Sequence, residues 1–180
     1  MATSTTQLRI VPLVVARDVY LVHEWVTHPR SVYWDMQEAT VDEVAEAYAE
    51  IWACEHHDAF IGLADGLPQF LVERYDPRHS ELADLPEIAD GDVGMHVLVA
   101  PTDEPEHGFT RSVMRFCFAD PAVSRVVVEP DTRNEAIAAL NGAAGFVVLR
   151  EVELPTKTAA LSVATRESFA SSDLESEIHP

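Results

Sequence analysis

The sequence is short of the residues that mark several classes of protein. Its two cysteines, Cys54 and Cys117, are too few for a disulfide framework or a zinc cluster. Lys157 is the only lysine among 12 basic residues. No apolar stretch approaches the length that spans a membrane, and the N-terminus lacks the apolar run of a signal peptide. We therefore expect a cytoplasmic protein, and the histidine spacing leads us to expect no metal.

Charge of one sign dominates the chain. There are 31 acidic residues against 12 basic ones, which gives a formal net charge of −19. Binding to a phosphate backbone needs a basic surface, so we expect no nucleic-acid partner. An acidic surface attracts small cations such as amines, but it also serves solubility alone, and both interpretations remain open.

Length and composition predict one domain. A chain of 180 residues with 47% hydrophobic residues can bury one core but not two large ones. We place this domain at residues 1–166. Residues 167–180 are rich in Ser and Glu without periodicity, which predicts an acidic, disordered tail.

Hydrophobic periodicity and turn signals predict an α+β fold with a mixed sheet. The predicted strands are residues 8–12, 59–64, 69–75, 93–99, 125–129, 146–154 and 159–165. The predicted helices are residues 18–27, 40–55, 109–119 and 132–140. The pair Asp65-Gly66 is a hairpin turn signal, and Thr40 with Glu43 forms a capping-box pattern. Thr132 with Glu135 repeats that pattern.

Two ionisable residues lie at the ends of the strands that flank the predicted helix at 109–119. His96 is near the end of one strand, and Asp131 is just beyond the next. A crossover helix makes these strands parallel, and ligands collect beyond the carboxyl ends of parallel strands. The pattern predicts a binding cleft with an acid–base pair. The alternatives are a buried, hydrogen-bonded histidine and an aspartate that caps a helix.

Four motifs carry a resemblance to a known family. They are HPRSVYW, DGLPQFLVERYDP, GDVGMHVLVAP and VEPDTRN. With the element order, they resemble the GNAT superfamily of acyl-coenzyme A-dependent N-acyltransferases. They are most similar to its siderophore branch, and within it to desferrioxamine-pathway acyltransferases that act on N-hydroxycadaverine. The resemblance implies a GNAT fold of about seven strands flanked by four helices.

The resemblance also implies roles for individual residues. His96 and Asp131 would be the acid–base groups. The pantetheine arm of the acyl-coenzyme A would pair with Val97, Leu98 and Val99, and Asn134 would position pantetheine or substrate amide groups. The coenzyme phosphates would bind where a glycine precedes a helix N-terminus. That last set is His107, Gly108, Phe109, Thr110 and Arg111. This loop departs from the superfamily pattern, because it keeps the first glycine but has Pro105 and Thr110 at two other positions of the motif.

The implied reaction is transfer of a succinyl or acetyl group to the hydroxylamine nitrogen of a cationic N-hydroxydiamine. Glu73 and the loop acids Glu81, Asp84, Glu87 and Asp90 are candidates for holding its far ammonium. Trp34 and Tyr75 are candidates for lining the binding site of the diamine's aliphatic chain or of a cation. Alternatively, both residues belong to the core. Two alternatives stay open: a different amine acceptor, such as N6-hydroxylysine, a polyamine, an aminoglycoside or a protein N-terminus, and a non-catalytic acyl-coenzyme A sensor.

Overall fold

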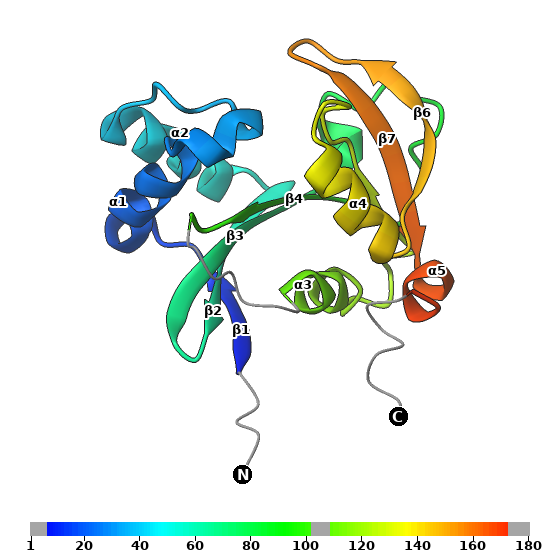
Figure 1. The fold of residues 1–180 in the computed structure, drawn as a ribbon, viewed down its shortest axis with the longest axis horizontal. Helices are drawn as coiled ribbons and strands as arrows, with labels where there is room; N and C mark the ends of the chain where they lie inside the picture. The colour runs from blue at the N-terminus through cyan, green and yellow to red at the C-terminus, as the bar shows by residue number, and fades with distance from the viewer. Residues whose placement is uncertain (1–6, 102–108, 173–180) are drawn as a thin grey trace. The chain divides into compact units, whose positions relative to one another are not determined.

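The computed structural model describes residues 7–101 and 109–172 (Figure 1). The chain divides into two compact units, Met1–Glu73 with Val97–Phe109, and Arg74–His96 with Thr110–Pro180. Among the described residues, no helix is long and apolar enough to cross a membrane.

Seven strands form a mixed sheet in the order β1-β2-β3-β4-β5-β7-β6, which confirms the predicted α+β fold. The strands are β1 Leu8–Pro12, β2 His57–Ala64, β3 Leu67–Tyr75, β4 Asp92–Val99, β5 Arg125–Val128, β6 Val147–Glu153 and β7 Thr158–Thr165. The predicted helices correspond to α1 Val15–Val26, α2 Val41–Ala53, α3 Phe109–Cys117 and α4 Glu135–Ala143. The described residues also form α5 Arg166–Ala170 and the 3-10 helices η1 Pro29–Trp34 and η2 Pro77–His79.

The first unit contains β1, β2 and the helices α1 and α2. β1 and β2 are antiparallel, with Leu8 opposite Ala64. Asp65 and Gly66 both have positive φ, 49° and 86°, as a tight hairpin turn between β2 and β3 requires. The predicted capping box at the start of α2 is present, with Thr40 and Glu43 exchanging hydrogen bonds. The core of this unit packs residues of both helices against the strands: Leu13, Val22, Trp25, Val26, Val44, Tyr48, Ile61, Leu71 and Ala100.

The second unit contains the predicted β-α-β crossover. β4 and β5 are parallel, as the crossover through α3 requires. β7 pairs antiparallel with β5 on one side and with β6 on the other. A core cluster beneath the β6–β7 hairpin consists of Leu82, Val127, Val152, Ala159 and Leu161.

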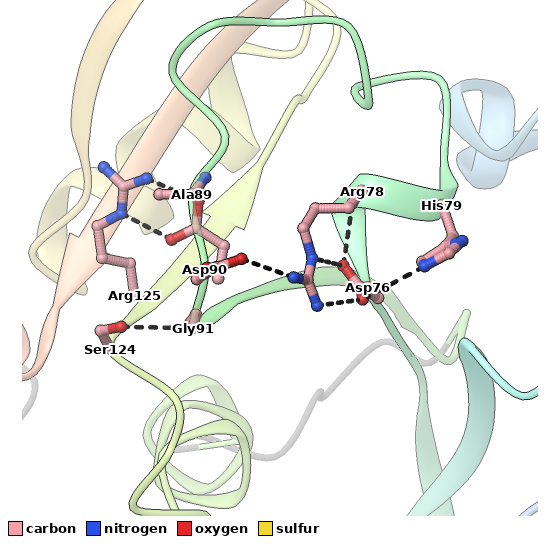
Figure 2. A network of polar contacts seen from close by, with 9 residues as sticks. Asp76, Arg78, His79, Ala89, Asp90, Gly91, Ser124 and Arg125 are labelled. Carbon is pink, nitrogen blue, oxygen red and sulfur yellow. Dashed lines mark hydrogen bonds and ion pairs between the residues drawn. The ribbon is translucent and has the colours of Figure 1, made fainter.

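The loop that leads into β4 is held by a network of ion pairs and hydrogen bonds (Figure 2). The guanidinium of Arg78 binds both Asp76 and Asp90. Near the start of β4, Arg125 donates two hydrogen bonds to Asp92, at 2.7 and 2.6 Å. The side chain of Asp92 is 1% exposed, so this bidentate pair fixes β4 against β5 inside the protein.

Two local predictions are wrong. Helix α4 is capped by Asn134, whose side-chain oxygen accepts from the N–H of Ile137, so Thr132 and Glu135 do not form the expected box. The tail predicted to be disordered begins with α5, which starts after β7 (Figure 1). Phe169 is buried there with its ring 5.9 Å from that of Phe118. Residues 173–180 of the predicted tail lie outside the described residues.

Candidate active site

The pairing of β4 with β5 positions a histidine beside a carboxylate. Asp92 is opposite Arg125, and Gly94 is opposite Val127. His96 is two residues after Gly94, and Glu129 is two residues after Val127. Because side chains alternate between the two faces of a sheet, His96 and Glu129 lie on the same face. His96 Nε2 lies 2.5 Å from Glu129 Oε1. The parallel register therefore builds the contact that defines this site.

Glu129 is almost completely buried, with a side chain that is 2% exposed. Its Oε2 atom accepts a hydrogen bond from the Tyr75 hydroxyl at 2.7 Å. Its Oε1 atom meets His96 and lies 3.6 Å from the ammonium of Lys157. Burial alone would raise the pKa of Glu129, but the positive charges of His96 and Lys157 and the hydrogen bonds lower it to about 2. Glu129 is thus a buried anion at neutral pH.

Tyr75 fills the space that Gly94 leaves on β4. A Cβ atom at Gly94 would lie 2.2 Å from ring carbons of Tyr75, so only glycine allows the ring to lie there. The Tyr75 ring is also 4.9 Å from the His96 ring, between centroids. The space beside His96 at Gly94 is therefore occupied by the Tyr75 ring.

This arrangement suits proton transfer by His96. The His96 side chain is 36% exposed, so part of the imidazole ring is accessible to solvent. When Nε2–H donates to a carboxylate, the neutral ring carries its lone pair on Nδ1. The buried anion also stabilises the ring after it gains a proton. His96 can therefore accept a proton at Nδ1, with Glu129 holding its tautomer.

Asp131, the other predicted acid–base residue, has a different set of partners. Its carboxylate accepts from the backbone N–H of Arg133 at 2.8 Å and from the Arg133 side chain at 2.9 and 2.6 Å. These hydrogen bonds, with the nearby charge of Lys157, lower the pKa of Asp131 to about 2. Asp131 does not cap α4, since Asn134 does. Its catalytic role stays a prediction.

The predicted substrate residues fall into two groups. Tyr75 belongs to the Glu129 site. Trp34 and Glu73 lie in the other unit, and both contact Tyr48. The Tyr48 hydroxyl donates a hydrogen bond to Glu73 Oε1 at 3.0 Å. The same hydroxyl interacts with the Trp34 side chain. His57 Nε2 lies 3.5 Å from Glu73 Oε2. Burial, with the Glu73 charge, raises the pKa of Tyr48 well above its usual value. Glu73 is 8% exposed, so it is a buried carboxylate.

Two of the acids expected to attract a substrate ammonium already have cationic partners. Asp90 is paired with Arg78, and Glu87 with Arg150. Both pairs are formed by loop or hairpin residues of the second unit. This weakens the case for these two acids as substrate ligands.

Sequence reasoning did not identify Glu129 and Lys157 as site residues. Glu129 ends the strand predicted at residues 125–129, and Lys157 lies between the strands predicted at residues 146–154 and 159–165. The sequence gives part of the signal for Glu129, because counting in steps of two aligns it with His96 once the register of Gly94 opposite Val127 is known. Lys157 gives no comparable signal, since its place depends on the fold of the β6–β7 hairpin.

Comparison with known proteins supplies the family. Residues 14–154 match the acetyltransferase (GNAT) domain family. The chain belongs to the GNAT family. It is 24% identical, over 93% of its length and 82% of the relative's, to N-hydroxyputrescine acetyltransferase of Acinetobacter baumannii.

Two solved structures share the fold. An uncharacterized protein of Bacillus halodurans superposes with a TM-score of 0.88 and 23% identity, covering 97% of this chain and 93% of that one. AAC(6')-Ib, solved with ribostamycin and coenzyme A, superposes with a TM-score of 0.80 and 23% identity, covering 91% of this chain and 96% of that one. This GNAT protein is an acyl-coenzyme A-dependent N-acyltransferase.

The start of α3 fits an anionic coenzyme. The first amides of a helix have no carbonyl partner within it, and they favour an anion. The first turns of α1, α2, α4 and α5 each contain an acidic residue, whereas that of α3 contains none. Thr110 and Arg111 stand in this turn, Thr110 being buried. His107 and Gly108, predicted to bind the phosphates with them, lie outside the described residues.

The predicted pantetheine residues occupy the last part of β4. The β4–β5 pairing joins Asp92–Gly94 to Arg125–Val127, and β4 continues beyond it to Val99. Val97, Leu98 and Val99 lie in this continuation, and all three are partly buried. Their contact with the coenzyme stays a prediction, as does that of Asn134.

Proposed function

We propose that this GNAT enzyme transfers the acyl group of an acyl-coenzyme A to the hydroxylamine nitrogen of an N-hydroxydiamine such as N-hydroxycadaverine. The product is a hydroxamate, which would serve the assembly of a desferrioxamine-type siderophore. The observation that carries the proposal is His96, partly exposed and held by the buried anion Glu129. The substrate class is supported by the four siderophore-branch motifs and by the relative that acetylates N-hydroxyputrescine.

The reaction needs a proton acceptor more than an activated nucleophile. A hydroxylamine nitrogen is less basic than an alkylamine, so much of it is neutral near pH 7 and ready to attack. As it attacks the thioester carbonyl, the N–C bond forms and the nitrogen loses its proton to His96 Nδ1. The C–S bond then breaks, and the sulfur leaves as the coenzyme thiolate, which takes up a proton. No covalent enzyme intermediate is required.

The protein contributes position and charge. Glu129 holds the His96 ring and stabilises it once protonated, which is the role that an oriented carboxylate plays beside a catalytic histidine. Asp131 is the second acid–base candidate, orienting the nucleophile or accepting a proton. The net charge of −19 attracts a cationic substrate. Trp34, Glu73 and Tyr75 are proposed to bind the diamine, with Glu73 as the partner of its ammonium.

We propose that the acyl donor binds through groups at three places in the fold. We assign its pantetheine arm to the backbone of Val97–Val99 and to Asn134, and its phosphates to residues 107–111. The absence of an acid from the first turn of α3 supports the phosphate assignment. The donor itself supplies the activated carbonyl.

The test compares acceptors with and without the hydroxyl group. N-hydroxycadaverine, cadaverine, N6-hydroxylysine and spermidine are each mixed with succinyl- or acetyl-coenzyme A, and released thiol and iron-binding hydroxamate are measured. The proposal expects N-hydroxycadaverine to exceed cadaverine by about 100-fold or more in kcat/KM. A preference for cadaverine or spermidine would point to a polyamine acetyltransferase. Absence of thiol release with every hydroxylated amine would refute the proposal.

A further inference from the structure

Lys157 lies beside the carboxylate that holds His96. It stands in the turn between β6 and β7, directly before Thr158. Its carbonyl accepts a hydrogen bond from the N–H of Leu154 at 2.9 Å, which closes the turn. Its side chain is 22% exposed, so solvent screens the charge of the ammonium less than it would at the surface.

The two oxygens of Glu129 have different partners. Oε2 accepts a hydrogen bond from the Tyr75 hydroxyl at 2.7 Å. Oε1 lies 2.5 Å from His96 Nε2 and 3.6 Å from the ammonium of Lys157. The ammonium is beyond hydrogen-bond distance, so it acts on this oxygen through its charge. An imidazole and an ammonium therefore share one oxygen of a buried carboxylate.

The charges of this cluster balance when His96 is neutral. The charge of Lys157 acts on two carboxylates, Glu129 and Asp131, and helps to lower the pKa of each to about 2. Asp131 is also paired with Arg133, 2.6 Å away. Two carboxylates and two cations leave no net charge, so a proton on His96 would make the cluster positive.

Loss of Lys157 would reverse this balance. The cluster would then be negative with a neutral His96 and balanced with a protonated one. A histidine beside an uncompensated buried carboxylate favours the imidazolium form. An imidazolium has no lone pair with which to accept the proton of an attacking nitrogen. The ammonium opposes that form because it repels a second cation and weakens the field of the shared oxygen.

We infer that Lys157 is a positioning residue that keeps His96 in its neutral, proton-accepting form, because its ammonium shares the Glu129 oxygen that His96 binds. This inference rests on the proposed function, in which His96 takes the proton of the nucleophile. Glu129 then orients the ring, and Lys157 prevents the same carboxylate from protonating it before the substrate arrives.

The first test follows the protonation of His96 by proton NMR in the wild type and in Lys157→Met. The chain has eight histidines, and the ring signal of His96 is the one missing from the spectrum of His96→Ala. We expect the midpoint of the His96 titration to move up by about one pH unit in Lys157→Met, because a positive charge near the ring is lost.

Two further variants separate charge from structure. Lys157→Arg keeps the positive charge and should titrate as the wild type does. Arg150→Met removes one positive charge from the same hairpin, where Arg150 pairs with Glu87, and is the matched control. It should leave the midpoint unchanged. Lys157→Gln gives the same test as Lys157→Met if circular dichroism shows the methionine variant to be unfolded.

The pH–rate profile gives the second readout. With N-hydroxycadaverine and an acyl-coenzyme A, kcat/KM of Lys157→Met should fall by about tenfold at pH 6. It should match the wild type near pH 9, where His96 is neutral in both proteins. A purely structural role would instead lower the rate equally at every pH.

A midpoint that stays in place or moves down in a folded Lys157 variant overturns the inference. An equal loss of rate at pH 6 and pH 9 overturns it as well. The NMR titration needs no substrate, so it reports on Lys157 even if the protein acylates no N-hydroxyamine. Failure of the proposed function and failure of this inference are therefore distinguishable.

Discussion

His96 Nε2 and Glu129 Oε1 lie 2.5 Å apart, which joins β4 to the residue that follows β5. One partner is a partly exposed imidazole, and the other is a carboxylate that is 2% exposed. Such a pair fixes both the orientation and the tautomer of the histidine. The stability and the activity of the enzyme should therefore depend on the same carboxylate.

Replacing Glu129 by Gln tests this dependence in the kinetics. The amide keeps the size of the side chain but removes the charge that stabilises protonated His96. We expect kcat to fall by about 100-fold or more, and the acidic limb of the pH–rate profile to move to lower pH. Glu87→Gln, at a half-buried carboxylate paired with Arg150, is the control. An unchanged pH profile in Glu129→Gln would show that the carboxylate does not act through His96.

The same variant gives a prediction for stability against pH. The folded-state pKa of Glu129, about 2, is below its unfolded value near 4.5, so the ionised form stabilises the fold. This contribution is present in full above pH 4.5 and disappears as the pH falls through 2. The free energies of unfolding of the wild type and Glu129→Gln, measured with urea, should differ most at pH 6 and become equal near pH 2. A constant difference would contradict the assigned pKa.

Gly94→Ala should disturb the site through Tyr75. The added Cβ would meet the Tyr75 ring at 2.2 Å, which forces the ring away from Glu129 and His96. We expect a loss of about 1–3 kcal/mol in unfolding free energy, with lower activity. Gly142→Ala is the matched control, because nothing lies within 4 Å of its added Cβ in α4. Equal stability of the two variants would argue against the close packing of Tyr75 on Gly94.

The two cysteines should differ in reactivity. Cys117 is buried in α3, and burial raises the pKa of its thiol to about 12, whereas Cys54 is exposed. A thiol reagent such as Ellman's should therefore modify one thiol in the native protein and both after denaturation. The thiol-release assay consequently needs Cys54→Ser as a background control. Rapid reaction of two thiols in the native state would contradict the burial of Cys117.

Local signals in the sequence predicted most of the elements. The Asp65-Gly66 turn and the Thr40 capping box depend on residues adjacent in the chain, and both are present. The short helix α5 was missed because its sequence shows no periodicity, and it is stabilised by tertiary contacts such as that of Phe169 with Phe118. The start of α4 was misplaced because both Thr132 and Asn134 are good caps, and local sequence does not rank them.

The site was predictable only in part. The position of His96 near the end of a parallel strand follows from strand and helix order. The partnership of His96 with Glu129 depends on the register between β4 and β5, which is a long-range property. Tyr75 and Lys157 reach Glu129 by side-chain directions that no local pattern encodes. Glu73 likewise shares hydrogen bonds with Tyr48 from a helix distant in sequence.

The most direct measurement is the rate of thiol release by His96→Ala with N-hydroxycadaverine and an acyl-coenzyme A. Removing the ring takes away a partner of the buried carboxylate of Glu129, so the melting temperature should fall, and circular dichroism checks that the variant is folded. If His96 accepts the proton of the attacking nitrogen, kcat falls by about 100-fold or more. A folded His96→Ala that turns over at the wild-type rate would contradict the account.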